Sequence, residues 1–228
     1  YDKNNNNLLK KVFLYTLFTV IVNSEWGAFG DNGVLEFIST EFDKVIDENS
    51  LNPLKQKYEK MISGLYLGEL LRLILVKLIN NKLILKGKLS VIMATFGNIE
   101  TITLSIISLG KIDSVMKVFQ DLGYNECDIS NEDVNIITKI CDVICKRAAY
   151  LTGTGIATII NKIDCDEMTV GITGSLYRYH PFFKKYLIEG INLIKKPNKK
   201  FYLHLTCDGS GIGAAIVAAL GSKNTIEC

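Results

Sequence analysis

The sequence predicts an α/β fold, because segments with the pattern of strands alternate with segments that follow the helical period. Three observations carry this prediction: an apolar run near the N-terminus, long helix-forming stretches in the middle, and short alternating stretches near the C-terminus that end in glycine turns. The chain of 228 residues has room for one large domain or a tight pair, and no linker-like composition divides its second half.

The N-terminal part is predicted to hold a strand followed by a loop. Lys10 and Lys11 precede the apolar run of residues 12–22, in which β-branched and aromatic residues favour a buried strand over a signal peptide. The glycine-rich residues 23–33 follow and carry the only tryptophan, Trp26. We therefore expect a strand that ends in an irregular loop.

Helix signals dominate the next part of the chain. A helix is predicted over residues 39–47, and Pro53 opens a long helical region over residues 54–80, since proline suits a first helical turn. Gly64 and Gly68 are expected to break that region or to pack it closely against a neighbour. The remaining predicted elements are helices over residues 113–122, about 131–162, 182–194 and 214–220, and strands over residues 168–174, 176–179 and 201–207.

Composition argues against several classes of function. With 26 Lys+Arg against 24 Asp+Glu, the formal charge of +2 gives no support for binding nucleic acid. The most apolar stretch is interrupted by Glu69, Arg72 and Lys77, so no membrane span is expected. Six cysteines without a CxxC pair and only two histidines suggest neither a zinc site nor a Ser-His-Asp triad. We expect reduced, mostly buried thiols in a cytoplasmic chain.

A glycine-rich string, residues 208–213 (DGSGIG), lies between a predicted strand and a predicted helix. Gly209, Ser210 and Gly211 would let backbone N–H groups converge on an anion at a helix N-terminus. A tight turn with small residues for close packing explains the string equally well, and the local sequence leaves both interpretations open. Residues 153–155 (GTG) resemble a phosphate loop too, but they lie inside a helical pattern, which favours packing against a neighbour.

The loop of residues 23–31 (NSEWGAFGD) combines an amide, a carboxylate and an indole. This set suits a sugar, because carboxylates accept paired hydrogen bonds from vicinal hydroxyls. The alternative is a solvated loop that Trp26 and Phe29 anchor in the core, and the local sequence favours that alternative. Glu59, in a first helical turn, is by itself typical of a residue that complements the helix dipole.

Taken together, these strings resemble the hexokinase family, specifically its large C-terminal lobe. The resemblance is carried by segments in the family's order and spacing, namely residues 23–31, 52–75, 147–160, 170–187 and 208–219. It implies the actin-like, ribonuclease-H-like ATPase fold, of which residues 22–228 would form the large-lobe half with helical insertions. Residues 1–21 are expected to be a divergent or low-complexity segment with one strand.

The resemblance also implies ATP-dependent transfer of a phosphoryl group to the 6-hydroxyl of a hexose such as glucose, with Mg²⁺ accompanying the ATP. Its implied sugar-binding residues are Glu25, Gln56 and Glu59, with Asn23 in the same sugar-side loop. Its implied nucleotide-binding residues are Gly64, Gly209, Ser210 and Gly211. The partners would be hexose and ATP.

The family's catalytic aspartate and its two phosphate loops belong N-terminal to Asn23, and no matching string is found in residues 1–22. The missing small lobe would be the natural structural partner. Since phosphoryl transfer depends on positioning and on charge stabilisation, we expect the isolated chain to be inactive. Two interpretations stay open: a truncated piece of a hexokinase, or a non-catalytic hexokinase-like module that binds sugar or regulates a partner. The EWGAFGD string argues against a different actin-like ATPase.

Overall fold

The computed structural model describes residues 22–206 and 209–224 of the chain. The predicted strand over residues 12–22 lies, apart from its last residue, outside the described residues. The α-helices of the described part are α2 (Glu41–Glu48), α3 (Lys57–Ile62), α4 (Gly64–Asn80), α5 (Val91–Ala94), α6 (Thr101–Ser108), α7 (Ile112–Asp121), α8 (Asn131–Lys162), α9 (Ser175–Tyr179), α10 (Phe183–Ile194) and α11 (Gly209–Asn224). The strands are β1 (Glu167–Ile172) and β2 (Lys200–Leu205), and the 3₁₀ turns η1, η2 and η3 occupy Trp26–Ala28, Leu85–Gly87 and Glu126–Asp128.

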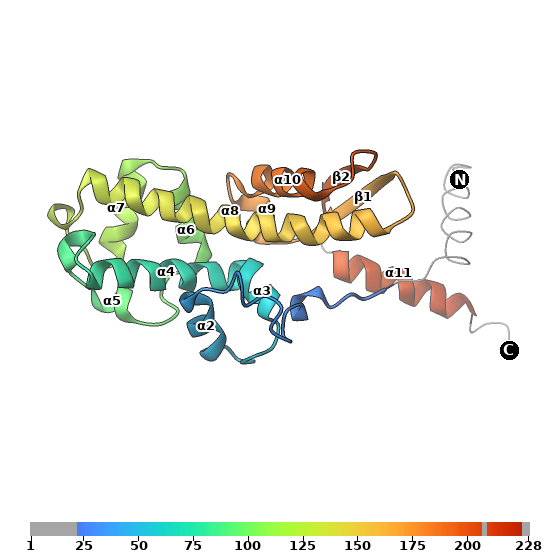
Figure 1. The fold of residues 1–228 in the computed structure, drawn as a ribbon, viewed down its shortest axis with the longest axis horizontal. Coiled ribbons are helices and arrows are strands. Elements are labelled where there is room, and N and C mark those ends of the chain that lie inside the picture. Colours follow the sequence, from blue (N-terminus) through green and yellow to red (C-terminus); the bar gives the residue numbers. More distant parts are fainter. Residues whose placement is uncertain (1–21, 207–208, 225–228) are drawn as a thin grey trace.

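The long helix α8 is the axis of the fold. In Figure 1 it runs along much of the molecule, with α4 to α7 grouped around one end and α9, α10 and the sheet near the other. It contacts α3, α4, α6, α7 and α10. The Ser130 hydroxyl accepts a hydrogen bond from the Asp133 N–H at 3.0 Å, and the Asp133 carboxylate accepts one from the Ser130 N–H at 2.8 Å. This reciprocal cap fixes the helix start where the sequence predicted it.

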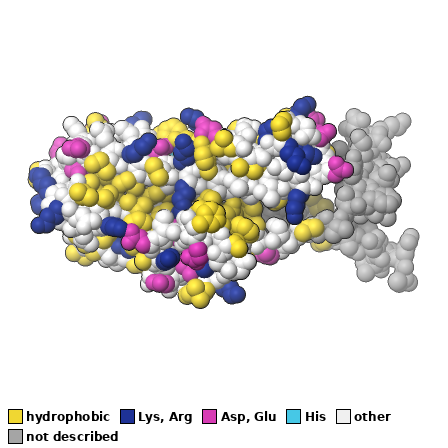
Figure 2. All heavy atoms as spheres, in the orientation of Figure 1, with side chains coloured by type: hydrophobic (Ala, Val, Ile, Leu, Met, Phe, Trp, Pro, Cys, Tyr) yellow, Lys and Arg dark blue, Asp and Glu magenta, His cyan; other side chains and the backbone are white. Residues whose placement is uncertain are grey.

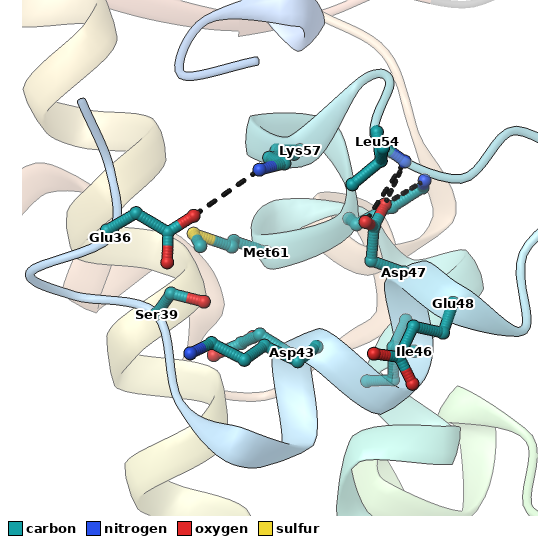
Figure 3. A pocket seen from close by; sticks show the side chains of 11 residues that line it. Glu36, Ser39, Asp43, Ile46, Asp47, Glu48, Leu54, Lys57 and Met61 are labelled. Atoms are coloured by element: carbon teal, nitrogen blue, oxygen red, sulfur yellow. Dashed lines mark hydrogen bonds and ion pairs between the residues drawn. The ribbon is translucent and has the colours of Figure 1, made fainter. Parts of the chain in front are cut away.

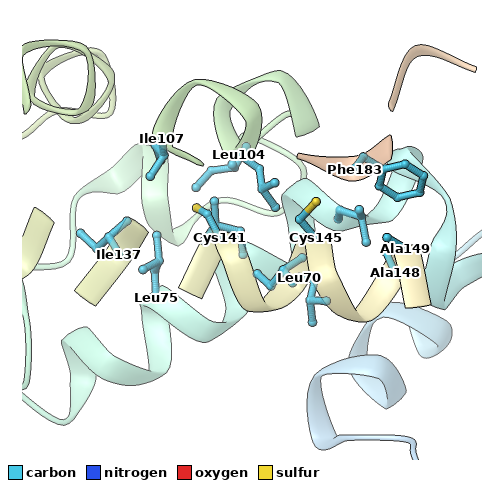
Figure 4. Close-up of a cluster of buried hydrophobic side chains, with 14 of the residues drawn as sticks. Leu70, Leu75, Leu104, Ile107, Ile137, Cys141, Cys145, Ala148, Ala149 and Phe183 are labelled. Atoms are coloured by element: carbon cyan, nitrogen blue, oxygen red, sulfur yellow. The ribbon is translucent and has the colours of Figure 1, made fainter. Parts of the chain in front are cut away.

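The hydrophobic core lies along the buried face of α8. Ile137, Cys141 and Ala148 of α8 lie on that face, and all three are fully buried. Figure 4 shows side chains from several helices meeting there, namely Leu70 and Leu75 of α4, Leu104 and Ile107 of α6, Ile137, Cys141 and Cys145 of α8, and Phe183 of α10. Each fully buried Leu, Ile or Phe contributes about 1.5–3 kcal/mol relative to an exposed one.

The thiols divide into two kinds. Cys141 and Cys145 are buried and free, whereas Cys127 and Cys165 are free and exposed. Burial raises the pKa of Cys145 to about 12, so this thiol stays protonated and unreactive near neutral pH. The expectation of mostly buried thiols is therefore wrong for half of the cysteines that the structure describes.

The two described strands form a parallel pair. Glu167 lies opposite Lys200 and Ile172 lies opposite Leu205, and both strands overlap their predicted ranges. The connection between them consists of α9 and α10, and α10 packs along α8. This arrangement brings the C-terminal end of β1 to the side of the molecule where the candidate site lies.

Two predictions near the C-terminus are wrong. Residues 176–179 form helix α9 instead of a strand, because Gly174, at φ 141°, turns the chain and its carbonyl accepts the Arg178 N–H at 3.2 Å. Four residues are too few for alternation to distinguish strand from helix. Helix α11 begins at Gly209, so the glycine string forms the first turns of a helix rather than a turn ahead of residues 214–220. Small side chains are compatible with a helix, and each glycine lowers helix stability by only about 1 kcal/mol relative to alanine.

The predicted helical region over residues 54–80 begins only at Lys57, because Leu54 and Gln56 are left-handed, but it is interrupted as the glycines predicted. Helix α3 ends at Ile62, Ser63 is extended, and α4 begins at Gly64. Inside α4, a Cβ added at Gly68 would lie 2.0 Å from the carbonyl oxygen of Ile99. The segment before α6 therefore approaches α4 so closely that only glycine fits.

Charged side chains are mixed over the surface. On the face shown in Figure 2, lysine and arginine side chains are scattered among aspartate and glutamate side chains rather than gathered in one patch. None of the helices in the described part of the chain has the length and apolar character needed to cross a membrane.

Candidate functional site

A pocket of about 640 Å³ lies where separate segments of the chain meet. Its walls are residues 23–27 of the glycine-rich loop, α3 with its flanking residues, Thr152 of α8, and the connection from β1 into α10. The four residues predicted to bind sugar, Asn23, Glu25, Gln56 and Glu59, all line this pocket, and so does Gly64. The structure thus brings five of the eight predicted site residues together, while their roles stay predictions.

The Glu25 carboxylate is exposed at the pocket and is oriented by its own loop. The Asn23 side-chain amide donates a hydrogen bond to Glu25 Oε1 at 2.6 Å. Glu25 has a left-handed backbone, with φ 44° and ψ 42°. This conformation costs a non-glycine residue about 1–2 kcal/mol, so it persists only where neighbouring contacts stabilise it. Asn23 therefore orients Glu25 in addition to lining the pocket.

The short helix α3 presents Gln56 and Glu59 to the same pocket. Gln56 precedes the helix and is also left-handed, with φ 55° and ψ 40°, while Glu59 lies exposed in the first turn. Two carboxylates from distant segments, with an amide beside each, form a set of acceptors and donors. Such a set suits a ligand with several hydroxyl groups.

The opposite side of α3 closes a smaller pocket of about 310 Å³ against α2 (Figure 3). Four of its charged side chains form two pairs: Lys60 Nζ lies 2.6 Å from Asp47 Oδ1, and Lys57 Nζ lies 3.4 Å from Glu36 Oε1. Asp47 also accepts the Leu54 N–H at 3.0 Å. These contacts tie α3 to its surroundings on one side, which leaves the other side to carry the side chains of the larger pocket.

Aromatic side chains anchor the loop, but only Trp26 packs against the core as the alternative interpretation expected, because Phe29 is 56% exposed. The rings of Trp26 and Phe29 each contact the Tyr58 ring edge-to-face, with centroids 5.9 Å apart. The Tyr58 hydroxyl donates a hydrogen bond to the Leu151 carbonyl of α8. Burial raises the pKa of Tyr58 to about 12, so this donor keeps its proton. Because Trp26 also lines the pocket, anchoring and ligand contact are compatible.

The GTG string of residues 153–155 serves packing, in agreement with its helical pattern. A Cβ added at Gly153 would lie 2.9 Å from the Ile191 backbone nitrogen of α10. One added at Gly155 would lie 2.4 Å from the Trp26 ring. Helix α8 therefore approaches α10 and the loop too closely for larger residues, and this explains the glycines without a phosphate.

The glycine string of α11 does not join the pocket. Among the residues that the structure describes, those that line the pocket include none from α11. Gly209, Ser210 and Gly211 form the first turn of α11. Their assignment to a nucleotide stays a prediction.

Other polar residues of the pocket were not among the predicted site residues. Thr152 of α8 and Thr173, Ser175 and Tyr177 around the start of α9 all line it. The Tyr177 hydroxyl is buried and has no hydrogen-bond partner among the described residues. These residues lie in two segments that carry the family resemblance, 147–160 and 170–187, but their place in the pocket depends on how β1 and α9 pack beside α3.

His180 lies outside the pocket, in a buried polar cluster. The Phe182 N–H donates to His180 Nδ1 at 3.2 Å, so the proton lies on Nε2, which donates to Ser108 Oγ at 3.3 Å. Cys145 Sγ lies 3.3 Å from Nδ1. Burial lowers the pKa of His180 to about 4, which keeps the imidazole neutral at pH 7. His180 thus connects α6, α8 and the start of α10.

Comparison with known proteins decides the family. A family model described as Hexokinase matches residues 4–220. The chain belongs to the hexokinase family. The match begins ahead of residue 22 and so includes most of the segment that the sequence analysis separated from the main unit. How this hexokinase-family chain divides into domains stays a prediction.

Individual hexokinases show how much of the family's length is present. The chain is 40% identical over 210 residues to the hexokinase of Schistosoma mansoni, covering 88% of this chain and 45% of that protein. It is 41% identical over 216 residues to Hexokinase-1 of Homo sapiens, covering 90% of this chain and 23% of that protein. The structure of the Schistosoma mansoni hexokinase complexed with glucose has a TM-score of 0.82 at 37% identity, over 92% of this chain and 49% of that one. The chain therefore spans less than half the length of these hexokinases.

The structural similarity confirms the predicted fold class. The similar structures are hexokinases, which have the actin-like ATPase fold, and this chain combines helices and strands in a mostly helical arrangement. The resemblance read from the five sequence segments is confirmed by the same comparisons.

Proposed function

We propose that this chain is the sugar-facing part of a hexokinase that transfers a phosphoryl group from ATP to the 6-hydroxyl of a hexose such as glucose. One observation carries the proposal: Glu25, Gln56 and Glu59, from two separate segments, line a single pocket. The glucose in the similar Schistosoma mansoni structure supports a hexose as the ligand.

The two glutamates would accept hydrogen bonds from sugar hydroxyls, and Gln56 and Asn23 would supply further donors and acceptors. A hydrogen bond to a charged group contributes about 1.5–3 kcal/mol, more than one between neutral groups. Acceptors on two segments would contact hydroxyls at different ring positions and so fix the orientation of the ring. Phosphoryl transfer depends on such positioning.

The nucleotide would approach from the start of α4. A Cβ added at Gly64 would lie 3.7 Å from its nearest neighbour, the Leu176 Cβ, so the absent side chain leaves the backbone open to a ligand. The N-terminus of a helix favours anions such as phosphate. In residues 22–206 and 209–224 no three Asp, Glu, His or Cys side chains gather to bind a metal, so Mg²⁺ would enter with the ATP phosphates and neutralise their charge.

The chain alone is proposed to bind sugar without phosphorylating it. Among the described residues that line the pocket, the ionisable side chains are Glu25, Glu59 and Tyr177. With both carboxylates engaged by the sugar, only Tyr177 remains in this set. Burial raises the pKa of its hydroxyl, so it stays protonated at neutral pH and cannot act as a general base. Loss of a general base costs about 10²–10⁴-fold in rate. The same observation favours a second candidate function, a hexokinase-like module that binds hexose without catalysis.

Trp26 provides the test, because the only tryptophan of the chain lines the pocket. Titration with glucose should change its fluorescence, and titration with an acyclic polyol of equal size should not. A coupled assay with ATP, Mg²⁺ and glucose should show no product above a protein-free blank. A fluorescence signal indifferent to glucose would contradict the proposal, and ATP-dependent product would contradict the inactivity of the isolated chain. A further experiment adds the small lobe of a related hexokinase. Part of a catalytic hexokinase would then gain activity, whereas a non-catalytic sugar-binding module would not.

A further inference from the structure

The carboxylate of Asp31 connects the two segments that supply the predicted sugar-binding residues. Asp31 Oδ2 accepts the Gln56 N–H at 3.1 Å, and Asp31 Oδ1 accepts the Lys57 N–H at 3.0 Å. Asp31 itself belongs to the loop that carries Glu25, and it is half-buried. One side chain of the loop therefore caps the start of α3 from outside the helix.

The turn that Asp31 caps is unusual in its backbone. Leu54 and Gln56 are both left-handed, with φ 65° and φ 55°, although neither is glycine. A carboxylate accepts the N–H of each: Asp47 accepts that of Leu54, and Asp31 accepts that of Gln56. The Gln56 side chain does not cap the helix. A strained turn persists only where its surroundings stabilise it, and these two carboxylates supply that stabilisation.

The loop packs closely against α3 beside Gln56, without room for an additional side-chain atom. A Cβ added at Gly27 would lie 2.3 Å from Gln56 Oε1 and 3.2 Å from Glu59 Cβ. The loop backbone at Gly27 therefore lies directly against the side chains that α3 presents to the pocket. A shift of α3 relative to the loop would change the spacing between Glu25 and Glu59.

We propose that Asp31 is a positioning residue for hexose binding: by accepting both N–H groups at the start of α3, it fixes Gln56 and Glu59 relative to Glu25. Asp31 does not line the pocket and makes no contact with the sugar in this scheme. The proposal rests on the proposed function of the pocket. It differs from a purely structural role, because a cap that only stabilises the fold would leave the affinity of the folded protein unchanged.

The test compares Asp31→Asn with the unsubstituted chain. Asparagine keeps the size of the side chain but turns its amide group towards one of the two N–H groups, which removes that hydrogen bond. Asp133→Asn is the matched control, because Asp133 also caps a helix and accepts the N–H of a distant residue, Leu85, at 3.1 Å, away from the pocket. Glucose affinity is measured by Trp26 fluorescence under conditions where urea titration shows each variant fully folded. Hydrogen exchange at Gln56 and Lys57 reports whether the cap is lost.

We expect Asp31→Asn to weaken glucose binding about ten-fold and to speed exchange at the amide that loses its acceptor. Asp133→Asn should lower stability and leave the affinity unchanged. Faster exchange with unchanged affinity would overturn the proposal, and so would unchanged exchange. Absence of glucose binding by the unsubstituted chain would overturn the proposed function, and the positioning role with it.

A second variant covers the case in which Asp31→Asn does not fold. Gly27→Ala keeps every hydrogen bond of Asp31 but pushes the flexible end of the Gln56 side chain aside. We expect about three-fold weaker glucose binding in a folded protein. In binding free energy, this is about half of the loss expected for Asp31→Asn. Unchanged affinity in this variant would show that the spacing between loop and α3 does not set hexose binding.

Discussion

The pocket wall, formed by residues 23–33, Gln56 and α3, and the core along α8 are built in opposite ways. The wall keeps the carboxylates of Glu25 and Glu59 exposed and includes two left-handed residues other than glycine, Glu25 and Gln56. The core consists of regular helices whose apolar side chains, such as Leu104 and Ile137, are 0% exposed. The wall is fixed by carboxylate-to-backbone hydrogen bonds together with a small aromatic cluster around Tyr58, and the core by close packing. From this difference we predict that sugar affinity depends on the wall and stability on the core, so that each can be changed separately.

The largest expected effect comes from the core. Leu104→Ala removes a fully buried side chain between α4 and α8, and such truncations cost about 2–5 kcal/mol. Urea unfolding should show this loss, while glucose titration of the protein that remains folded should give the affinity of the unsubstituted chain. Loss of affinity in fully folded Leu104→Ala would contradict the separation of core from wall.

The buried histidine makes the stability of the core depend on pH. The pKa of His180 falls from an unfolded value of about 6.5 to about 4 in the fold, so the folded state favours the neutral imidazole. Its stabilising contribution is therefore fully present above pH 6.5 and is lost as the pH falls towards 4, by about 3 kcal/mol in all. Urea unfolding across this range measures the loss. His180→Gln should reduce the pH dependence of the free energy of unfolding. His204→Gln, at an exposed strand position, should leave it unchanged. Equal pH dependence in the two variants would show that His180 is not its source.

The smallest expected effect lies where core and wall meet. Tyr177 lines the pocket, but its hydroxyl is buried without a partner among the described residues. Tyr177→Phe removes an unsatisfied polar group, so we expect a gain of about 1 kcal/mol in stability and no change in glucose affinity. Weaker glucose binding by this variant would show that the Tyr177 hydroxyl contributes to affinity and would contradict the assignment of this side chain to the core.

The sequence predicted the elements whose signals are local. The Ser130 cap and the helical period located α8, and the glycine at position 64 located the break before α4. Residues 81–112 gave no prediction, although they contain α5 and α6. Helix α6 (TITLSIIS) is rich in β-branched residues, and tertiary contacts support it: the Thr101 hydroxyl donates to the Gly64 carbonyl and accepts the Gly68 N–H at 3.2 Å. Such long-range hydrogen bonds leave no local pattern in a sequence.

The site shows the same division. The neighbouring sequence favoured a solvated loop around Glu25 and a Glu59 that complements the helix dipole. Only the family resemblance predicted that the two residues belong to one sugar site. Asp31 escaped prediction because the N–H groups that it accepts lie 25 and 26 residues further along the chain. The glycine string, judged by composition, suggested a turn, but its residues continue as helix α11.

The most direct test of the shared pocket is calorimetric titration of Glu25→Ala and Glu59→Ala with glucose. We predict that each variant binds glucose at least about ten-fold more weakly, because each loses a charged acceptor. Their free energies of unfolding should stay within about 0.5 kcal/mol of the unsubstituted chain, since both side chains are exposed. Glu48→Ala, at an exposed position beside the smaller pocket, should change neither quantity. Glucose affinities that remain unchanged in both Glu25→Ala and Glu59→Ala would contradict the claim that these carboxylates form one sugar site.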